Sequence, residues 1–550
     1  MKSIVYKRVS PILFDDTNLD RMFMVLFERC VKLGSTSKPR KKKDFDPIQG
    51  SLNLEMTLIP KLSTSENFRN FDNETGREIL TQWIRTSIAQ FSTEGKTGKG
   101  SQLDYLKLLS LAVYRSGLPK MENRSSNRGI DDTFYKILHE YVGSLPGCDN
   151  PEREIHNQIC STSLAKGIDF NPQFQPWNSP MYNEREQVDI NSLLQLRLLE
   201  HFPGIKADDS QKIREQRLQE LLMPKNEPLV RLAEDFFNIT RWFGQRSGAE
   251  LFEMYKSVFA IRLFQLPIYI SRELLASKHK IQAKPIAMFF DFTEDSKSDS
   301  WKLANESLLM DIASANLLTH EMVSLRESEE FIKKNNSTLN EFSALNKKEQ
   351  LYYLYEFMES SVAQDKAYES IQELKTHFEN MGEEGSTSLE IIDGAVSRAN
   401  NAFDALIHLI LLDVGQRGAK SLRKWFYSVG GLEEQKNIRS ISILTGQQKR
   451  TTSWTYVMSD SVLNTLLELC FIDKKGNDKQ RMELELSEVL NLLKTNYGIL
   501  INEPPIGKNS PEFQHAAAQN FIAFKKRLRQ LGWFEGLSDD FDAQYIKRIG

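Results

Sequence analysis

The stretch LVRLAEDFFNITRWFGQRSGAELFEMYKSVFAIRL, residues 229–263, indicates the fold class most clearly. Its large apolar side chains recur three or four positions apart, which is the spacing of one face of an α-helix. One stripe comprises Leu229, Leu232, Phe236, Ile239 and Phe243, and a second comprises Leu251, Met254, Val258, Ile261 and Leu263. We expect Pro267 to interrupt this helical pattern, because proline cannot donate a helical hydrogen bond.

The same periodicity recurs through most of the chain. It predicts helices over residues 19–33, 76–91, 103–114, 133–142, 301–331, 347–381 and 389–426. Strand signals are fewer: residues 51–58 alternate between apolar and polar side chains, and residues 286–291 form an unbroken apolar run that ends in Asp291. Such a run is typical of a buried strand. The predicted fold class is therefore mainly α with minor β (α+β).

At 550 residues the chain is too long for one core, so we expect several domains. An N-terminal α+β domain spans residues 1–116, and a loop-rich connection with frequent Pro and Gly spans residues 117–185. A central helical domain with the buried strand spans residues 186–431. The last segment, residues 432–550, combines short helices with short strands. That pattern resembles a winged-helix module, although it also fits a small helical bundle.

The formal net charge is only −3, from 71 basic and 74 acidic side chains. Any contact with nucleic acid must therefore come from a local basic patch. No apolar run reaches the roughly 18 residues of a membrane span, and the N-terminus lacks the apolar core of a signal peptide. The four cysteines include no CxxC pair, which argues against structural zinc. We therefore expect a cytoplasmic protein with no membrane contact and no cofactor.

Two glycine-rich stretches bear a partial likeness to phosphate-binding loops. The first, residues 95–101, reads GKTGKGS, but Gln90 stands where the first glycine of a P-loop belongs. The second, residues 415–421, reads GQRGAKS, and Ala419 replaces the glycine that must precede the lysine. Both motifs lack a glycine that lets backbone amides converge on a phosphate. We interpret both as flexible surface connections, and nucleotide hydrolysis is not supported.

Asp291, Glu294 and Asp295 are the strongest candidates for catalysis or metal binding. An acid directly after a buried strand is where metal-dependent hydrolases place carboxylates, because the strand end is rigid. The Asp-x-Asp pattern of phosphatases is absent, since Thr293 occupies the second position. The simpler interpretation is that Asp291 caps the helix that follows. No serine or cysteine nucleophile motif occurs, so the sequence leans against an enzyme.

Two basic clusters are candidate nucleic-acid contacts. The first lies in residues 38–43 and includes Lys41, Lys42 and Lys43; it is equally well explained as a solvated connector. The second is the last predicted helix, residues 516–531, where Phe521, Phe524, Leu528 and Leu531 line one face. The remaining arc carries Lys525, Lys526, Arg527 and Arg529, and no acid occurs between residues 519 and 533. Such a helix can lie along a phosphate backbone, although late basic residues also complement the helix dipole.

The sequence, predominantly helical in pattern and rich in lysine, asparagine and isoleucine, resembles accessory proteins of bacterial antiphage defence islands. Two stretches carry the resemblance: PIAMFFDF at residues 285–292, and KKRLRQLGW at residues 525–533 with LSDD at 537–540. The chain is similar to the second component of the type I Druantia system, and comparably to methylation-associated defence components. The Druantia resemblance implies a multi-gene system with a large helicase, acting against invading DNA. It supplies no catalytic residues.

These observations lead to one main hypothesis and two alternatives. The main hypothesis is a non-enzymatic subunit of a multi-protein antiphage (antiviral) defence system that contacts DNA and partner proteins. The first alternative is a divergent metal-dependent nuclease that uses Asp291 with Glu294 or Asp295. The second is a pure protein scaffold, with the aromatic side chains of residues 351–357 exposed for a partner.

Overall fold

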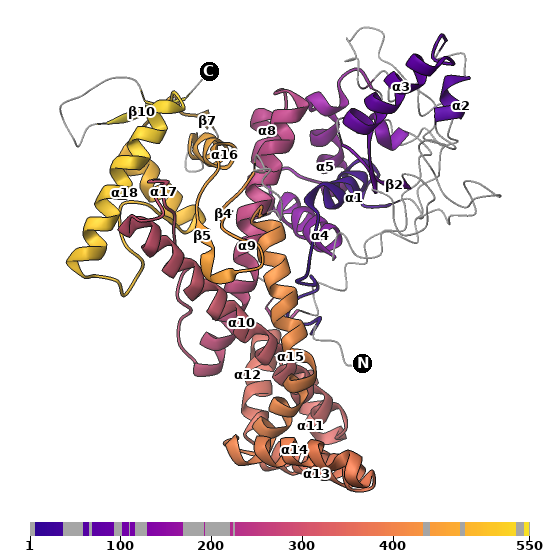
Figure 1. The fold of residues 1–550 in the computed structure, drawn as a ribbon, viewed down its shortest axis with the longest axis vertical. Helices are drawn as coiled ribbons and strands as arrows, with labels where there is room; N and C mark the ends of the chain where they lie inside the picture. Colours follow the sequence, from indigo (N-terminus) through magenta and orange to yellow (C-terminus); the bar gives the residue numbers. More distant parts are fainter. Residues whose placement is uncertain are drawn as a thin grey trace. The chain divides into compact units, whose positions relative to one another are not determined.

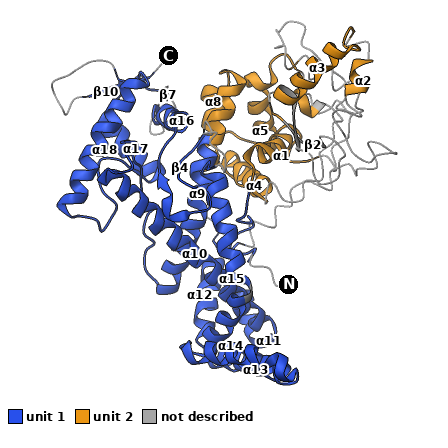
Figure 2. Ribbon diagram, in the orientation of Figure 1, with its two compact units in different colours: residues 1–16, 216–231, 257–550 blue, residues 17–215, 232–256 orange. Residues whose placement is uncertain are grey.

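The structure is a computed structural model that describes residues 6–36, 59–64, 69–92, 102–108, 110–115, 129–168, 192, 221–223, 226–432, 441–473, 479–534 and 544–548. The chain forms two compact units (Figure 2). Unit 1 comprises residues 1–16, 216–231 and 257–550, and unit 2 comprises residues 17–215 and 232–256. Within the described residues, no helix combines the length and the apolar character needed to cross a bilayer.

Unit 2 is built from short elements around an aromatic core. Its helices are α1 (Leu19–Val31), α2 (Ile59–Ser63), α3 (Glu74–Trp83), η4 (Ile84–Ile88), η5 (Leu111–Arg115), α4 (Ile130–Gly143), α5 (Pro151–Cys160) and η6 (Ser163–Ala165), and its strands are β1 (Ala89–Ser92) and β2 (Gln102–Leu106). The Phe27 ring lies 5.8 Å from that of Phe236, which lies 4.6 Å from that of Tyr255. All three rings are buried, and offset aromatic contacts of this kind add to their apolar burial.

Residues 229–263 lie in α8 (Glu227–Phe243) and α9 (Gly248–His279). Residues 227–231 and 257–279 of these helices belong to unit 1, and residues 232–256 belong to unit 2. Contrary to expectation, Pro267 lies inside α9 and does not end it. A proline at this position leaves the carbonyl of Leu263 without its helical donor. That carbonyl accepts a hydrogen bond from the indole Nε1 of Trp425 at 3.0 Å, which satisfies it.

Long helices dominate unit 1, as Figure 1 shows. After β3 (Met288–Phe289) the chain forms α10 (Asp299–Lys333), α11 (Asn336–Ala344), α12 (Lys347–Met358), α13 (Ser361–Glu379), η8 (Gly382–Gly385), α14 (Ser386–Arg398) and α15 (Ala402–Val429). Helices α10 and α15 pack against each other, and α13 and α14 pack against one another and against α15. In Figure 1, α11, α13 and α14 gather at the end of unit 1 opposite to α16–α18.

The C-terminal part of unit 1 combines short helices with two-residue and three-residue strands. Its elements are β4 (Leu444–Thr445), η9 (Thr451–Ser453), β5 (Thr455–Tyr456), α16 (Asp460–Cys470), β6 (Ile472–Asp473), β7 (Lys479–Gln480), β8 (Glu483–Glu485), α17 (Leu486–Tyr497), β9 (Ile499–Leu500), α18 (Pro511–Gln530) and β10 (Tyr545–Lys547). Strand β9 pairs in parallel with β3, and β8 pairs antiparallel with β10. The parallel pair joins the central and the C-terminal parts of the sequence.

The predicted fold class, mainly α with minor β, is confirmed. The buried run at 286–291 contains β3, and the helix expected over 301–331 is α10. The division into four segments and the winged-helix likeness of residues 432–550 stay predictions. The strand expected over 51–58 lies outside the described residues.

Several predicted elements are wrong in type or extent. Residues 103–114 form β2 and η5 instead of a helix, because β2 pairs with β1. The helix expected over 347–381 is two helices, since the Ser360 side chain accepts a hydrogen bond from the Ala363 amide and caps a new start. The helix expected over 389–426 is likewise interrupted at Asn401, which caps α15. Residues 117–183 contain α5 besides the single helix that we expected there.

Candidate functional site

Helix α18, the predicted basic helix, is fixed to unit 1 by a buried asparagine. The Asn520 side chain donates to the carbonyls of Phe290 (2.8 Å) and Ile501 (3.0 Å), and it accepts from the amide of Phe292 (2.7 Å). It thus joins the ends of the parallel strands β3 and β9. Phe524 packs edge-on against Phe292, with ring centroids 4.9 Å apart. The inner face of α18 is therefore a structural surface.

The four cations of α18 have different environments. Lys525 is buried with its ammonium group 4.8 Å from the centre of the Phe521 ring, and burial together with the nearby Arg529 lowers its pKa. Arg527 forms ion pairs with other parts of the chain: its Nε lies 2.8 Å from Asp460 and its Nη1 3.3 Å from Glu294. Only Lys526 and Arg529 are exposed. The outward positive face is therefore narrower than the sequence suggested.

The other basic candidates, Lys41, Lys42 and Lys43, lie outside the described residues. The glycine-rich stretch at 95–101 also lies outside the described residues. The second glycine-rich stretch, residues 415–421, lies within α15 and is not the loop that we expected. Gly418 is closely packed there, because a Cβ added to it would lie 2.7 Å from Thr319 Cγ2. Close packing explains why a glycine stands here, and a helical backbone does not form a phosphate-binding loop.

Asp291 is buried at the end of β3, where its carboxylate accepts several hydrogen bonds. Oδ1 accepts from the hydroxyls of Ser300 (2.6 Å) and Thr293 (2.9 Å), and Oδ2 accepts from the amide of Glu294 (3.1 Å). Burial raises the pKa of Asp291, and these hydrogen bonds oppose that rise. A carboxylate with this set of donors holds the turn that precedes α10.

The two acids predicted to join Asp291 point to different partners. Glu294 is exposed and pairs with Arg527, while the carboxylate of Asp295 accepts from the amide of Lys297 at 2.9 Å. In the part of the chain that the structure describes, no three His, Cys, Asp or Glu side chains are placed to hold one metal ion. The three acids are adjacent in sequence without converging in space.

Helices α13, α14 and α15 carry an unusual number of exposed large apolar side chains. The most exposed are Leu412 (61%), Tyr368 (59%) and Ile391 (49%), and Met381, Val396, Val362 and Leu374 add to them. By contrast, α13 buries only Ala363, Ala367 and Ile371, and α14 buries only Ile392 and Ala395. We call α13, η8, α14 and the first turns of α15 the helical arm.

The helical arm is also acidic. Residues 361–400 contain eight acidic side chains and three basic ones. The acidic residues are Asp365, Glu369, Glu373, Glu379, Glu383, Glu384, Glu390 and Asp393, and the basic residues are Lys366, Lys375 and Arg398. The scaffold alternative had placed exposed aromatics at residues 351–357, but Tyr355 and Phe357 are buried there. The exposed apolar surface lies instead one helix further along.

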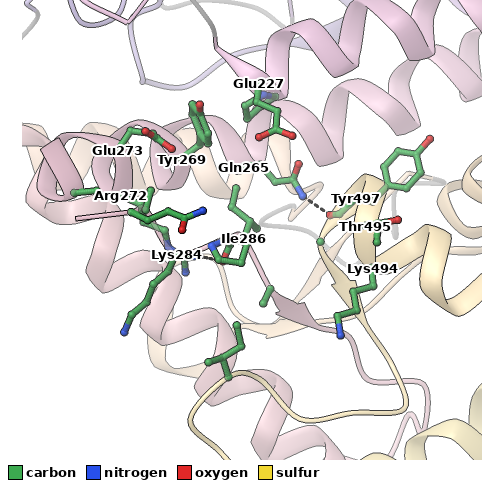
Figure 3. Close-up of a pocket in the computed structure, with 18 of the residues that line it drawn as sticks. Glu227, Gln265, Tyr269, Arg272, Glu273, Lys284, Ile286, Lys494, Thr495 and Tyr497 are labelled. Carbon is green, nitrogen blue, oxygen red and sulfur yellow. Dashed lines mark hydrogen bonds between the residues drawn. The ribbon is translucent and has the colours of Figure 1, made fainter. Parts of the chain in front are cut away.

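A pocket of about 1030 Å³ lies within unit 1 (Figure 3). Its lining comes from the start of α8, the second half of α9, residues 281–287, the start of α12, the end of α17 and the loop at 500–509. Figure 3 shows Glu273, Tyr269 and Gln265 along α9, with Lys494, Thr495 and Tyr497 across from them. Several pieces of chain thus converge on one cavity.

Hydrogen bonds between side chain and backbone hold the pocket together. Gln265 Nε2 donates to the carbonyl of Tyr497 at 2.5 Å, drawn as a dashed line in Figure 3, and Arg272 Nη1 donates to the carbonyl of Pro285 at 2.7 Å. Gly498 has a φ of +65°, and a Cβ added there would lie 2.6 Å from the carbonyl oxygen of Ile286. This close approach requires glycine.

Sequence reasoning missed both the helical arm surface and the pocket. For the arm a signal existed: Ala363, Ala367 and Ile371 form the buried stripe, which leaves Tyr368 and Leu374 on other faces of α13. For the pocket no local signal existed, since its lining residues are scattered between positions 227 and 509 and no motif contains them.

A family model matches nearly the whole chain. The family model of the methylation-associated defense system protein MAD7 matches residues 1–548. Neither the curated proteins nor the solved structures yield a match. The match supports the resemblance to methylation-associated defence components and not the specific resemblance to Druantia. Because the matched region covers nearly the whole chain, the protein belongs to the MAD7 family and is a component of a methylation-associated defense system.

Proposed function

We propose that this protein is a non-enzymatic subunit of its defence system and binds another protein of that system through the helical arm. The observation that carries the proposal is the set of exposed apolar side chains on α13, α14 and α15. Exposed apolar surface that gathers on neighbouring helices is typical of protein interaction sites. Its burial on binding contributes roughly 25 cal/mol for each Å² of apolar area.

The small number of buried residues in the helical arm supports a partner. Helix α13 has nineteen residues, yet only two alanines and one isoleucine of it are buried. Helices gain most of their stability in proteins from packing of an apolar face. A partner that covers Tyr368 and Ile391 supplies packing that the arm does not obtain from this chain alone.

The charge of the helical arm indicates the chemistry of the partner. Eight acidic residues against three basic ones favour a partner face that combines basic and apolar side chains. The same charge repels the phosphate backbone of nucleic acid. The occupant is therefore a protein, and a second copy of this acidic arm is disfavoured.

A binding experiment with purified components tests the arm. The triple variant Tyr368→Glu, Ile391→Arg, Leu412→Arg places charge on the arm, and Met482→Arg is the control because Met482 is exposed (64%) in another part of unit 1. We expect the wild type and the control to bind another purified protein of the system after nuclease treatment. The triple variant should bind at least about a hundredfold more weakly, as interface hot spots typically do.

Either of two results contradicts the arm proposal. In one, no protein of the system binds the wild type. In the other, the triple variant binds as tightly as Met482→Arg. Circular dichroism of the triple variant separates loss of binding from loss of folding, since the changed side chains are exposed.

A second contact, with DNA, is favoured by the exposed pair Lys526 and Arg529, three residues apart on α18. If both side chains lie against phosphates, replacing them by alanine should reduce the slope of log K against log salt by about 2, which is roughly one unit for each cation. Lys333→Ala, which removes a half-exposed lysine at the end of α10, serves as the control. An unchanged slope in the double variant excludes this helix as a DNA contact.

The non-enzymatic part of the proposal rests on the hydrogen bonds of Asp291. Both of its oxygens accept from protein donors, and Glu294 is engaged with Arg527. We expect purified protein to leave single-stranded and double-stranded DNA intact in the presence of Mg²⁺ or Mn²⁺. Cleavage that disappears in Asp291→Asn, a variant that keeps the size of the side chain, would instead support the nuclease alternative.

A further inference from the structure

We propose that the pocket of unit 1 binds a nucleotide, with its phosphate at the lysines of the rim and its hydroxyl or amino groups at the carboxylates of α8 and α9. The walls of the pocket are held by hydrogen bonds between distant segments, as in a preformed binding site. Residues from α9 are bonded to backbone carbonyls of two distant segments, at Tyr497 and at Pro285. The walls are thereby fixed before a ligand arrives, which reduces the entropy lost on binding.

Three lysines from three separate segments provide the anion-binding side. Lys284 follows α9, Lys348 lies in the first turn of α12, and Lys494 lies near the end of α17. Within the described residues, Lys284 has no ion-pair partner, and Lys494 pairs with Glu503 at 2.5 Å with about half of its side chain exposed. Lysine ammonium groups are common phosphate ligands, and all three lysines line the pocket.

The opposite side of the pocket carries carboxylates that suit donor groups of a ligand. Glu227 and Glu273 both line the pocket, and burial and the charge of Glu227 raise the pKa of Glu273. Burial and the Glu273 charge also raise the pKa of Tyr269 to about 12, so its hydroxyl keeps its proton. Carboxylates here repel a simple anion and accept hydrogen bonds from hydroxyl or amino groups.

The size and the aromatic lining narrow the class of ligand further. A volume of about 1030 Å³ is at the upper end of small-molecule pockets, so an isolated phosphate leaves most of it unfilled. Tyr269 and Tyr352 line it and offer flat apolar faces, whereas the Tyr497 ring is buried with the Arg262 guanidinium 4.4 Å from its centre. A ligand with an anionic end, hydrogen-bond donors and a planar ring satisfies all three parts of the lining, and nucleotides have this combination.

Calorimetry with defined probes tests the proposal. The probes are the four ribonucleoside 5′-monophosphates, the corresponding triphosphates, inorganic pyrophosphate and a twelve-residue oligothymidylate. We expect at least one nucleotide to bind with a Kd below about 1 mM. The double variant Lys284→Glu, Lys348→Glu should weaken that binding about a hundredfold or more, which corresponds to the loss of about tenfold for each contact at 1.4 kcal/mol. Lys420→Glu, a change of an exposed lysine outside the pocket, should leave it unchanged.

A carboxylate variant checks the orientation of the ligand. Glu273→Gln keeps the shape of the side chain and removes its charge. If the carboxylate accepts from the ribose or the base, this variant weakens nucleotide binding about tenfold while the affinity for pyrophosphate stays the same or rises. An equal loss for both probes contradicts the arrangement proposed here.

Three outcomes overturn the proposal as a whole. They are the absence of binding by every nucleotide, nucleotide binding that the double lysine variant leaves intact, and binding of the oligothymidylate alone. The last of these would assign the pocket to nucleic acid. Thermal denaturation of each variant confirms that it is folded, which is expected because Lys284 and Lys348 are exposed.

Discussion

At the scale of single residues, Asn520 forms hydrogen bonds with three backbone groups, two of them buried and one part-buried. They belong to Phe290, Phe292 and Ile501. Asn520→Leu removes all three hydrogen bonds at once, and each unsatisfied buried group costs about 1–3 kcal/mol. We expect the free energy of unfolding to fall by about 3 kcal/mol or more in urea denaturation. Gln519→Leu, at an exposed neighbouring position, should change it by less than about 0.5 kcal/mol.

Asp311 is the residue whose titration should be visible in the stability of the protein. It is buried, it accepts hydrogen bonds from Arg272 and Tyr456, and burial raises its pKa to about 6. The carboxyl group titrates near pH 4 in an unfolded chain, so the folded state binds more protons between pH 4 and 6. This contribution is fully present below pH 4 and is lost as the pH rises through 6.

The variant Asp311→Asn isolates that effect. As the pH falls from 7 to 4, the stability of the wild type should rise relative to the variant by about 2 kcal/mol, because only the wild type gains the proton. Urea denaturation of both proteins at several pH values measures the difference. A difference that stays constant with pH, or that shrinks on acidification, shows that the pKa of Asp311 is not raised.

At the scale of helices, α9 and α15 are coupled through the carbonyl that Pro267 leaves without a donor. Trp425→Phe removes the indole donor to Leu263 and should destabilise the protein by about 1–3 kcal/mol. In a Pro267→Ala background the alanine amide can donate to the same carbonyl. The cost of Trp425→Phe should then be smaller by about 1 kcal/mol, which a double-mutant cycle measures. Additive effects would show that the hydrogen bond does not carry the coupling.

The helical elements could be predicted from sequence wherever local signals were sufficient. Helix α10 (Asp299–Lys333) covers the range 301–331 that we expected, because its apolar spacing and the Ser298 cap agree. Signals for the breaks at Ser360 and Asn401 were present as capping residues, but the apolar periodicity on either side concealed them. Strand β2 could not be predicted in this way, since its pairing with β1 depends on residues elsewhere in the chain.

The candidate sites were predictable to a smaller degree, and for the same reason. The sequence located the cations of α18 but not the acids Asp460 and Glu294, which reach Arg527 from other elements. It placed Asp291 after a buried strand, but not the hydroxyl of Ser300 that occupies one of its oxygens. Local composition shows which groups exist, and only the tertiary contacts show which of them remain exposed.

At the scale of the whole molecule, residues 499–534 complete the core of unit 1. Strand β9 pairs with β3, Asn520 of α18 donates to the carbonyl of Phe290, and Met288, Phe289 and Phe290 are fully buried. A chain that ends at residue 498 should therefore expose this core, bind a hydrophobic dye and aggregate on gel filtration. A chain that ends at residue 534 keeps β9 and α18 and should remain folded. Equal behaviour of the two truncations would contradict this role of the C-terminal residues.

The hydrogen bond between Gln265 and Tyr497 also has a consequence for the newly made protein. The two residues are 232 positions apart in the sequence, so α9 leaves the ribosome long before its partner is synthesised. At 5–20 residues per second, that interval lasts roughly 12 to 46 seconds. During it the nascent chain holds only one side of the pocket. Each molecule therefore acquires the pocket only after residue 509 has been synthesised, and chains terminated before that residue never do.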